Sequence, residues 1–241
     1  YQGENYSPKG HKYIVSFEWE KVPTWVYRIG GVLLKKEIAY DTTTFRLYIR
    51  YTLLDAHSAT TLRLKPFLAF RSVRQWTHEN GAANTGFEAV ENGIRMCLYQ
   101  GYPDLYMQLN HKAEWHHQPD WYRGLDYPKE RERGYDSSED LMVPGYFEMP
   151  IKKGESIIFT ASLASVAPRQ MGKLMDAEIA ALDSRDSFYH CLVNAAHQFK
   201  VQKDGENYLL AGYPWFKGRA RDMFIAMPGI TLSIGEVEMY E

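Results

Sequence analysis

A short segment near the C-terminal end gathers side chains that can bind a sugar. Residues 212–229 read Gly-Tyr-Pro-Trp-Phe-Lys-Gly-Arg-Ala-Arg-Asp-Met-Phe-Ile-Ala-Met-Pro-Gly. Aromatic rings offer a flat apolar surface to the C–H face of a pyranose, while a guanidinium and a carboxylate can hold hydroxyls through charge-assisted hydrogen bonds. The segment therefore predicts a glucose subsite. Its predicted substrate-binding residues are Trp215, Phe216, Arg221 and Asp222.

Two interpretations of the Arg221-Asp222 pair stay open on local chemistry alone. A carboxylate in the first turn of a helix is favoured by the helix dipole, so the pair could simply anchor a helix N-terminus. Alternatively, Asp222 accepts hydrogen bonds from sugar hydroxyls, a role that suits a carboxylate beside a guanidinium better than proton donation. The aromatic residues just before the pair favour substrate binding.

Candidate catalytic groups are harder to find than candidate binding groups. Glycoside hydrolysis needs two carboxyl groups that flank the bond, about 6.5–9.5 Å apart in an inverting enzyme. Glu130 with Glu132, and Glu139 with Asp140, are too close in sequence to guarantee that gap. We therefore assign no catalytic residue.

Metal and thiol chemistry are not indicated either. His111, His116 and His117 fit no ligand signature, and an alternating strand would send His116 and His117 to opposite faces. Cys97 and Cys191 are far apart and lack a metal-ligand spacing. We expect no metal, no organic cofactor and, with two reduced thiols, a cytoplasmic location.

The composition excludes two classes of partner. The 241 residues are 45% hydrophobic and 24% charged, with a formal net charge of −2. This balance provides no basic surface for nucleic acid or an anionic membrane. The longest apolar stretch, residues 157–167, is too short to cross a bilayer. We expect neither nucleic acid nor a membrane as a partner.

The spacing of hydrophobic residues divides the chain. From His11 to about Ser165 it has a period of two, typical of antiparallel strands, and beyond Pro168 it becomes helical. The expected strands include residues 13–19, 25–34, 45–53, 61–70, 94–99, 105–109 and 156–163. The expected later elements are helices at 170–182, 185–201 (with Ser184 as N-cap) and 222–234, and a short extended segment at 208–211.

The segment 212–229 as a whole is similar to a segment found in a known family. The order Tyr213-Pro214-Trp215-Phe216, then Arg221-Asp222, then an apolar run ending in Pro228-Gly229, resembles the opening of the catalytic barrel in bacterial and archaeal glycogen debranching enzymes of the amylo-α-1,6-glucosidase type. Ala220 departs from the pattern, because the family usually has Gly before the Arg-Asp pair. Alanine would be strained there if the backbone needs a positive φ.

A second region also resembles this family, in its sandwich domain. Residues 121–124, 130–134 and 139–145 follow a similar pattern of an aromatic residue, Glu and Arg-Gly, then Glu-Asp and Pro-Gly. Its charges either form an ion-paired loop that braces the sandwich against the barrel, or reach over the active site and hold a branched chain. Charged runs are usually solvated or paired, which favours the structural alternative.

The resemblance implies a mainly β chain with three parts. These are a large antiparallel β-supersandwich at 1–168, a helical linker at 169–205, and the truncated start of an (α/α)6 catalytic barrel at 206–241. About twelve helices, each of roughly a dozen residues, cannot fit after residue 206.

The resemblance also implies a function. The chain would be the N-terminal part of a debranching enzyme that hydrolyses the α-1,6 branch glucose of glycogen or limit dextrin. Its ligand would be an α-glucan, and the C-terminal barrel domain of the parent chain would supply the catalytic acid and base. We expect this chain alone to be inactive.

Two alternatives remain. The first is a non-catalytic β-sandwich module that binds glucan or a protein partner, with Trp19 or Trp121 as its sugar contact. Titration with maltooligosaccharides separates it from the enzyme fragment, since a split site would bind weakly. The second is a disaccharide phosphorylase, another supersandwich family, in which this Tyr-Pro-Trp-Phe and Arg-Asp arrangement is not expected.

Overall fold

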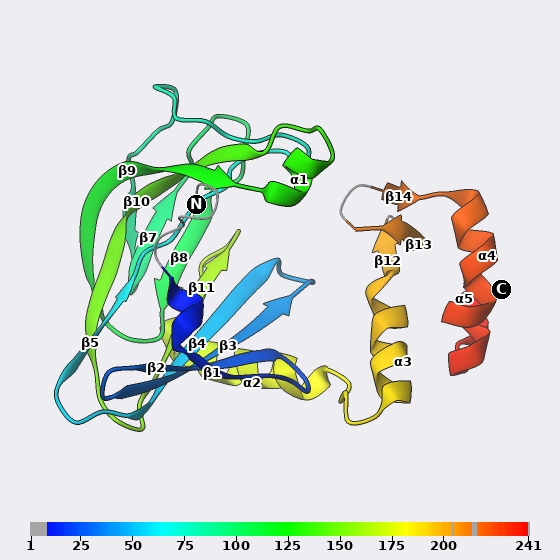
Figure 1. The fold of residues 1–241 in the computed structure, drawn as a ribbon, viewed down its shortest axis with the longest axis horizontal. Coiled ribbons are helices and arrows are strands. Elements are labelled where there is room, and N and C mark those ends of the chain that lie inside the picture. The colour runs from blue at the N-terminus through cyan, green and yellow to red at the C-terminus, as the bar shows by residue number, and fades with distance from the viewer. Residues whose placement is uncertain (1–8, 204, 214–215, 241) are drawn as a thin grey trace. The chain divides into compact units, whose positions relative to one another are not determined.

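The computed structural model describes residues 9–203, 205–213 and 216–240. The chain divides into two compact units, Tyr1–Ala181 and Leu182–Glu241, and each is considered by itself. Strands dominate the first unit and helices the second (Figure 1). The chain is mainly β with a large antiparallel sheet, which confirms the predicted fold class in this form. The predicted barrel start and the boundaries at 168/169 and 205/206 stay predictions.

The larger sheet of the first unit has eight antiparallel strands in the order β1-β2-β3-β4-β11-β8-β7-β6. They are β1 (Ile14–Trp19), β2 (Pro23–Ile29), β3 (Val32–Asp41), β4 (Arg46–Asp55), β6 (Glu88–Val90), β7 (Gly93–Met96), β8 (Leu105–Leu109) and β11 (Ser156–Ser162). A short 3-10 helix, η1 (Gly10–Tyr13), precedes β1. Because β11 pairs with both β4 and β8, one late strand joins the two halves of the sheet.

The smaller sheet has three antiparallel strands in the order β5-β10-β9. They are β5 (Thr60–Leu64), β9 (Glu114–Asp126) and β10 (Ser138–Ile151), and the short helix α1 (Pro128–Glu132) links the last two. Gly145 lies at a register shift in β10 with φ +146°, and a Cβ there would lie 2.0 Å from the His116 carbonyl oxygen. The Gly in the Pro144-Gly145 pattern therefore has a structural reason.

The hydrophobic core of the first unit lies between the two sheets. Leu53, Leu109 and Ile157 of the larger sheet are completely buried, as are Phe147 and Met149 of the smaller one to within 1%. Burying each such side chain contributes about 1.5–3 kcal/mol relative to exposure. The period-two pattern of the sequence reflects this one-sided burial.

Helix α2 (Met171–Ala181) covers the other face of the larger sheet, and the 3-10 turn η2 (Pro168–Gln170) leads into it. Met171 and Met175 are fully buried there, and Asp176 forms an ion pair with Arg50 of β4 at 2.6 Å. The helix predicted at 170–182 is thereby confirmed.

Several predicted strands were wrong in extent. Residues 25–34 form a hairpin, because Gly30 adopts φ +59° and reverses the chain between β2 and β3. The strands predicted at 61–70 and 94–99 end at Leu64 and Met96. Beyond these ends the ladders do not continue, although the Leu68 N–H still donates to the Met142 carbonyl at 2.9 Å and the Asn84 N–H to the Leu98 carbonyl at 2.8 Å.

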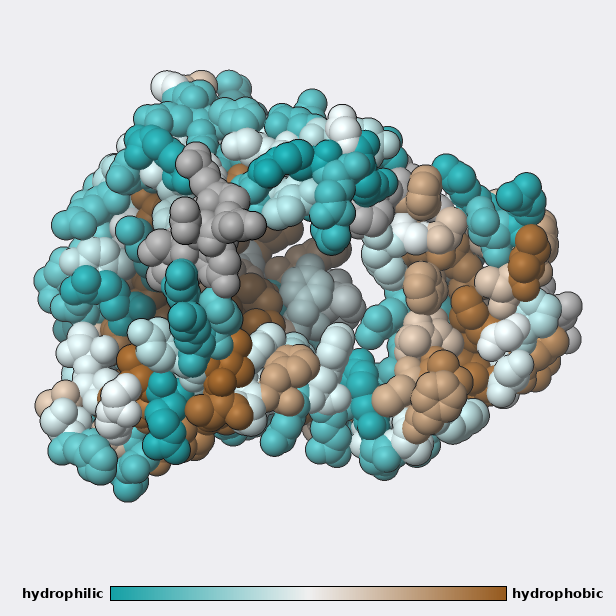
Figure 2. Space-filling view, in the orientation of Figure 1, coloured by the Kyte–Doolittle hydropathy of each residue, from teal (hydrophilic) through white to brown (hydrophobic). Residues whose placement is uncertain are grey.

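The second unit contains a small antiparallel sheet and helices. Its elements are α3 (Phe188–Gln198), β12 (Lys200–Lys203), β13 (Glu206–Gly212), β14 (Phe216–Gly218), α4 (Ala220–Ile230), the 3-10 turn η3 (Leu232–Ile234) and α5 (Val237–Tyr240). Figure 2 shows hydrophobic surface on this unit, where Phe188, Phe224 and Ile225 are at least 71% exposed. In the described part of the chain, no helix is long and apolar enough to span a membrane.

Several details of this unit correct the sequence predictions. Ser187, not Ser184, is the N-cap of α3, and its side chain accepts a hydrogen bond from the His190 N–H at 3.1 Å. The helix predicted to reach residue 201 ends at Gln198, since the chain then pairs with β13 as β12. The segment at 208–211 lies within β13. The helix predicted at 222–234 is present as α4, but it begins at Ala220 and ends at Ile230, and the 3-10 turn η3 follows it.

Candidate functional site

The predicted subsite lies where β14 gives way to α4. Phe216 begins β14, and Arg219 is the N-cap of α4, with an extended backbone and no side-chain capping bond. Arg221 and Asp222 therefore lie in the first helical turn. Trp215, the remaining predicted residue, lies outside the described residues.

The departure at Ala220 causes no strain. Ala220 begins α4, so its backbone is helical. Among the described residues, the non-glycine positions with positive φ are Phe45 and Asn92. An alanine is therefore compatible with this helix start.

Phe216 is held from within the unit. It pairs with Gly212 across β13 and β14, and a Cβ on Gly212 would lie 3.3 Å from Phe216 Cδ2. The Arg219 guanidinium carbon lies over the ring, 4.2 Å from its centroid. Phe216 is still 45% exposed. Arg219 was not among the predicted residues, because its contact with Phe216 depends on the backbone path from β14 into α4.

Arg221 and Asp222 keep their hydrogen-bonding capacity. Arg221 is exposed and Asp222 is half-buried. Within the part of the chain that the structure describes, neither side chain forms an ion pair or a hydrogen bond, not even with the other. Asp222 also lies where the helix dipole favours a carboxylate, so its position alone does not separate the two interpretations.

A chain of ion pairs fixes the segment that follows α4. His197 of α3 contacts Asp183 through Nδ1 at 3.1 Å and Glu236 through Nε2 at 2.9 Å. Lys200 also binds Glu236, and this contact holds the pKa of Glu236 below its ordinary value. The charges around the end of α3 are thus used within the unit.

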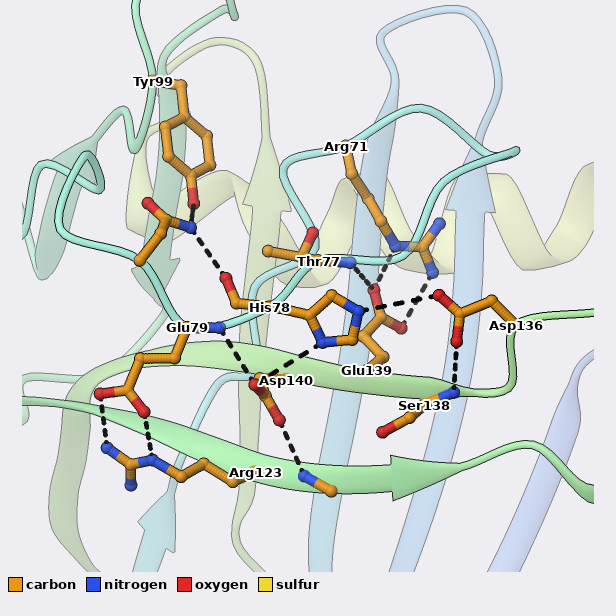
Figure 3. Close-up of polar contacts among 12 residues, drawn as sticks. Arg71, Thr77, His78, Glu79, Tyr99, Arg123, Asp136, Ser138, Glu139 and Asp140 are labelled. Carbon is orange, nitrogen blue, oxygen red and sulfur yellow. Dashed lines mark hydrogen bonds and ion pairs between the residues drawn. The ribbon is translucent and has the colours of Figure 1, made fainter.

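In the first unit, the charged segment 139–145 begins with the buried carboxylate of Glu139 (Figure 3). Arg71 donates to both oxygens of Glu139, and the Nη2–Oε2 contact is 3.1 Å. The Tyr127 hydroxyl donates to Oε2 at 2.7 Å, and the Thr77 N–H donates to Oε1 at 3.3 Å. Burial raises the pKa of Glu139, but the hydrogen bonds from Arg71 and Tyr127 outweigh it and hold the pKa below its ordinary value.

An aromatic stack supports the same carboxylate. The Trp76 ring stacks on Tyr127 with centroids 4.5 Å apart, and the Arg71 guanidinium lies 4.7 Å from the Trp76 centroid. The Trp76 indole N–H donates to the Asp136 carbonyl at 2.5 Å. Burial, followed by the bond to Glu139, raises the pKa of Tyr127 to about 12. Tyr127 therefore remains a hydrogen-bond donor at neutral pH.

Asp140 anchors the other side of this region. Its carboxylate accepts hydrogen bonds from the Glu79 N–H at 3.0 Å and the Gly124 N–H at 2.9 Å. The Glu79 carboxylate in turn binds Arg123 through both oxygens, at 2.5 and 2.9 Å (Figure 3). Burial raises the pKa of Asp140, but the hydrogen bonds from the two backbone N–H groups, together with nearby positive charge, lower it by more. The pKa of Asp140 therefore stays below its ordinary value.

The remaining candidate carboxylates are also paired. Glu130 contacts Arg133 at 3.3 Å, and Glu132 contacts Lys129 at 2.8 Å. These two pairs are local to α1, whereas Glu139 and Asp140 fasten residues 71–80 to β9 and β10. This supports the structural alternative for the charged region.

Two models of known families match this chain. The family model described as glycogen debranching enzyme N terminal matches residues 1–158, and that described as amylo-alpha-1,6-glucosidase matches residues 192–239. The chain belongs to the glycogen debranching enzyme family. A comparison with curated proteins found no match. The narrower bacterial and archaeal type stays a prediction.

The second match covers all four residues of the predicted subsite, Trp215 included. Phe216, Arg221 and Asp222 all lie within 192–239, at the junction of β14 and α4. The carboxylates at 130–140 lie within the first match instead. The two halves of the resemblance therefore fall in two different units.

In the first unit, an apolar cleft of about 460 Å³ opens on the inner face of the larger sheet. Ile49, Met107 and Phe159 are among the residues that line it, and residues 66–71 form one side. Figure 2 shows hydrophobic surface inside the hollow of this unit. Aliphatic side chains line the cleft together with the aromatic residues Phe67, Phe70, Tyr102 and Phe159.

The histidines and Trp121 take structural positions in the sandwich. His116 stacks on Tyr146 at 4.6 Å, while His117 contacts Phe87 at 4.8 Å, which confirms that they face opposite ways. Over the described residues, no group of three potential ligands could hold a metal. Trp121 is 9% exposed and belongs to the core, so the suggestion that it contacts sugar was wrong.

Proposed function

We propose that this chain is the substrate-side part of a glycoside hydrolase that removes α-1,6-linked branch glucose from glycogen or limit dextrin. The observation that supports this best is the exposed start of α4. There, Arg221 and Asp222 have no partner among the described residues, beside a half-exposed aromatic ring in the segment that matches amylo-alpha-1,6-glucosidase. Charged groups without an internal partner are available to a ligand.

In this proposal each residue of the subsite has a distinct role. Arg221 donates hydrogen bonds to hydroxyls of the terminal glucose, and Asp222 accepts them. Phe216 and Trp215 border the sugar ring. Hydrolysis of this kind requires two carboxyl groups and neither a metal nor an organic cofactor.

The catalytic acid and base belong to a C-terminal (α/α)6 domain of the parent enzyme, and the sandwich acts as a scaffold. This part of the proposal rests on the candidate carboxylates of the sandwich, which are bound by cations, backbone N–H groups or Tyr127. A cytoplasmic location belongs to the same proposal and rests on Cys97 and Cys191, which are free thiols.

Titration of the chain with maltotriose, followed by NMR, tests the subsite. We expect weak binding that shifts the amides at the start of α4 and is lost in Arg221→Ala and Asp222→Asn. Lys129→Ala, at an exposed ion pair of α1, is the control and should bind as the parent does. Unchanged binding in both subsite variants would refute the assignment, and glucose release from branched dextrin would refute the absence of catalysis.

A second candidate function is a glucan-binding module with its own site on the sandwich. Phe17 and Trp19 of β1 are 52% and 50% exposed, and the Phe17 ring lies 5.1 Å from that of Trp25. Exposed aromatic rings on a sheet face suit sugar stacking. Micromolar binding of maltooligosaccharides that is abolished by Trp19→Ala would establish this function in place of the first.

A further inference from the structure

We propose that Arg219 is a substrate-binding residue of the same subsite, and that Phe216 supports its guanidinium rather than serving as the main stacking surface. This inference rests on the proposed function, because it concerns the same α-glucan ligand. Arg219 lies outside the Trp-Phe and Arg-Asp pairs. Its guanidinium contacts the Phe216 ring and keeps its N–H donors available.

The Phe216 ring has contacts within the unit on two sides. It lies close enough to Gly212 that a Cβ at that position would be 3.3 Å from Cδ2. The Arg219 guanidinium lies 4.2 Å from the ring centroid, which is a stacking distance. A sugar that approached the face covered by Arg219 would have to displace the guanidinium. The exposed 45% of Phe216 is thus better suited to bordering a ligand than to stacking under it.

The guanidinium itself is available to a ligand. Arg219 is exposed, and in the described part of the chain its side chain makes no hydrogen bond or ion pair besides the contact with Phe216. Stacking uses the flat face of a guanidinium and leaves the N–H groups in its plane free to donate. Packing on Phe216 also reduces the rotamer freedom that the side chain would lose on binding.

The spacing of Arg219 and Asp222 adds an acceptor to these donors. Arg219 is the N-cap of α4 and Asp222 is the third residue of that helix, the two positions between which a capping box forms its contacts. The two are not paired with each other in the structure. A planar set of donors next to a carboxylate fits neighbouring sugar hydroxyls, each of which can both accept and donate. The expected ligand is therefore the terminal glucose of a neutral α-glucan.

A double-mutant cycle with maltotriose as the probe tests this assignment. We expect Arg219→Ala to weaken binding about tenfold, the effect of losing one charge-assisted hydrogen bond. Arg219→Lys should recover only part of the affinity, because an ammonium lacks the planar set of donors. If Phe216 acts through Arg219, the double variant Phe216→Ala/Arg219→Ala should bind no worse than Arg219→Ala alone. The control is Arg169→Ala, which removes the same charge from an exposed position in η2.

The outcomes separate this inference from the function on which it rests. Additive losses in the double variant would show that Phe216 contacts the sugar independently and would overturn the supporting role. If Arg221→Ala and Asp222→Asn lose binding while Arg219→Ala retains it, the role of Arg219 is refuted and the subsite stands. If the parent chain does not bind maltotriose at all, both proposals fail. Because Arg219 makes no side-chain capping bond, Arg219→Ala should leave α4 folded. Unchanged amide chemical shifts along α4 in this variant would confirm it.

Discussion

The two charged regions of this chain use the same residue types in opposite ways. Around Glu139, arginine and carboxylate side chains are buried or paired, and each accepts or donates several hydrogen bonds within the sandwich. At the start of α4, Arg219, Arg221 and Asp222 form no ion pair among the described residues. Charges around Glu139 are satisfied within the sandwich, while those at the start of α4 have no internal charge partner among the described residues and, in our proposal, are available to a ligand. The residue types alone do not distinguish these two regions, but their hydrogen-bond and ion-pair partners among the described residues do.

The largest effect should come from removing the buried carboxylate. Glu139→Ala leaves Arg71 and the Tyr127 hydroxyl without their shared acceptor, and breaking a buried ion pair by one partner costs about 3–5 kcal/mol. Urea unfolding, monitored by tryptophan fluorescence, measures this loss. Glu132→Ala, at an exposed pair with Lys129, is the matched control and should change stability by less than about 1 kcal/mol. Equal effects in the two variants would contradict the comparison.

Acid should destabilise the sandwich through the same group. The folded-state pKa of Glu139 is lowered, so its contribution to stability is complete above its unfolded-state pKa and is lost as the pH falls through the folded-state value. Stability should therefore decrease as the pH falls below about 5, starting from the ordinary range of a Glu carboxyl. Glu139→Gln, already neutral, should show a flatter profile in urea unfolding at pH 3 to 7. A parallel profile would mean that other carboxylates dominate.

A smaller effect is expected when one hydrogen bond is removed and the ring remains. Tyr127→Phe keeps the stack on Trp76 but loses the 2.7 Å bond to Glu139. Hydrogen bonds to charged groups contribute about 1.5–3 kcal/mol, so the loss should be of that size. Urea unfolding at pH 7 gives the value, with Tyr135→Phe, an exposed tyrosine, as control. A change below about 0.5 kcal/mol would show that water replaces the phenol.

How much the sequence could predict follows the same division. The period-two pattern located the sandwich strands because burial on one face leaves a mark at every second residue. It could not show that Arg71 is the partner of Glu139, 68 positions away, since a pairing at that distance depends on how the sheets pack. It also missed the hairpin at Gly30, where alternation continues through a turn that only the backbone conformation reveals.

The subsite shows a different limit. Local motifs named Phe216, Arg221 and Asp222 because their types and order are sufficient to suggest sugar binding. The contact of Arg219 with Phe216 depends on the geometry of the β14–α4 junction, and it was not predicted. Sequence reasoning thus identified which groups could act, but not which of them support one another.

The smallest expected effect on stability concerns Asp222. Asp222→Asn should destabilise α4 only by its interaction with the helix dipole, about 0.3–1 kcal/mol. Native-state hydrogen exchange of the α4 amides measures this change directly. Arg221→Ala, with no partner among the described residues, should change it by less than about 0.5 kcal/mol. A loss above about 2 kcal/mol in Asp222→Asn would show that the carboxylate has a contact within the unit beyond the helix dipole, and would contradict the difference between the two charged regions.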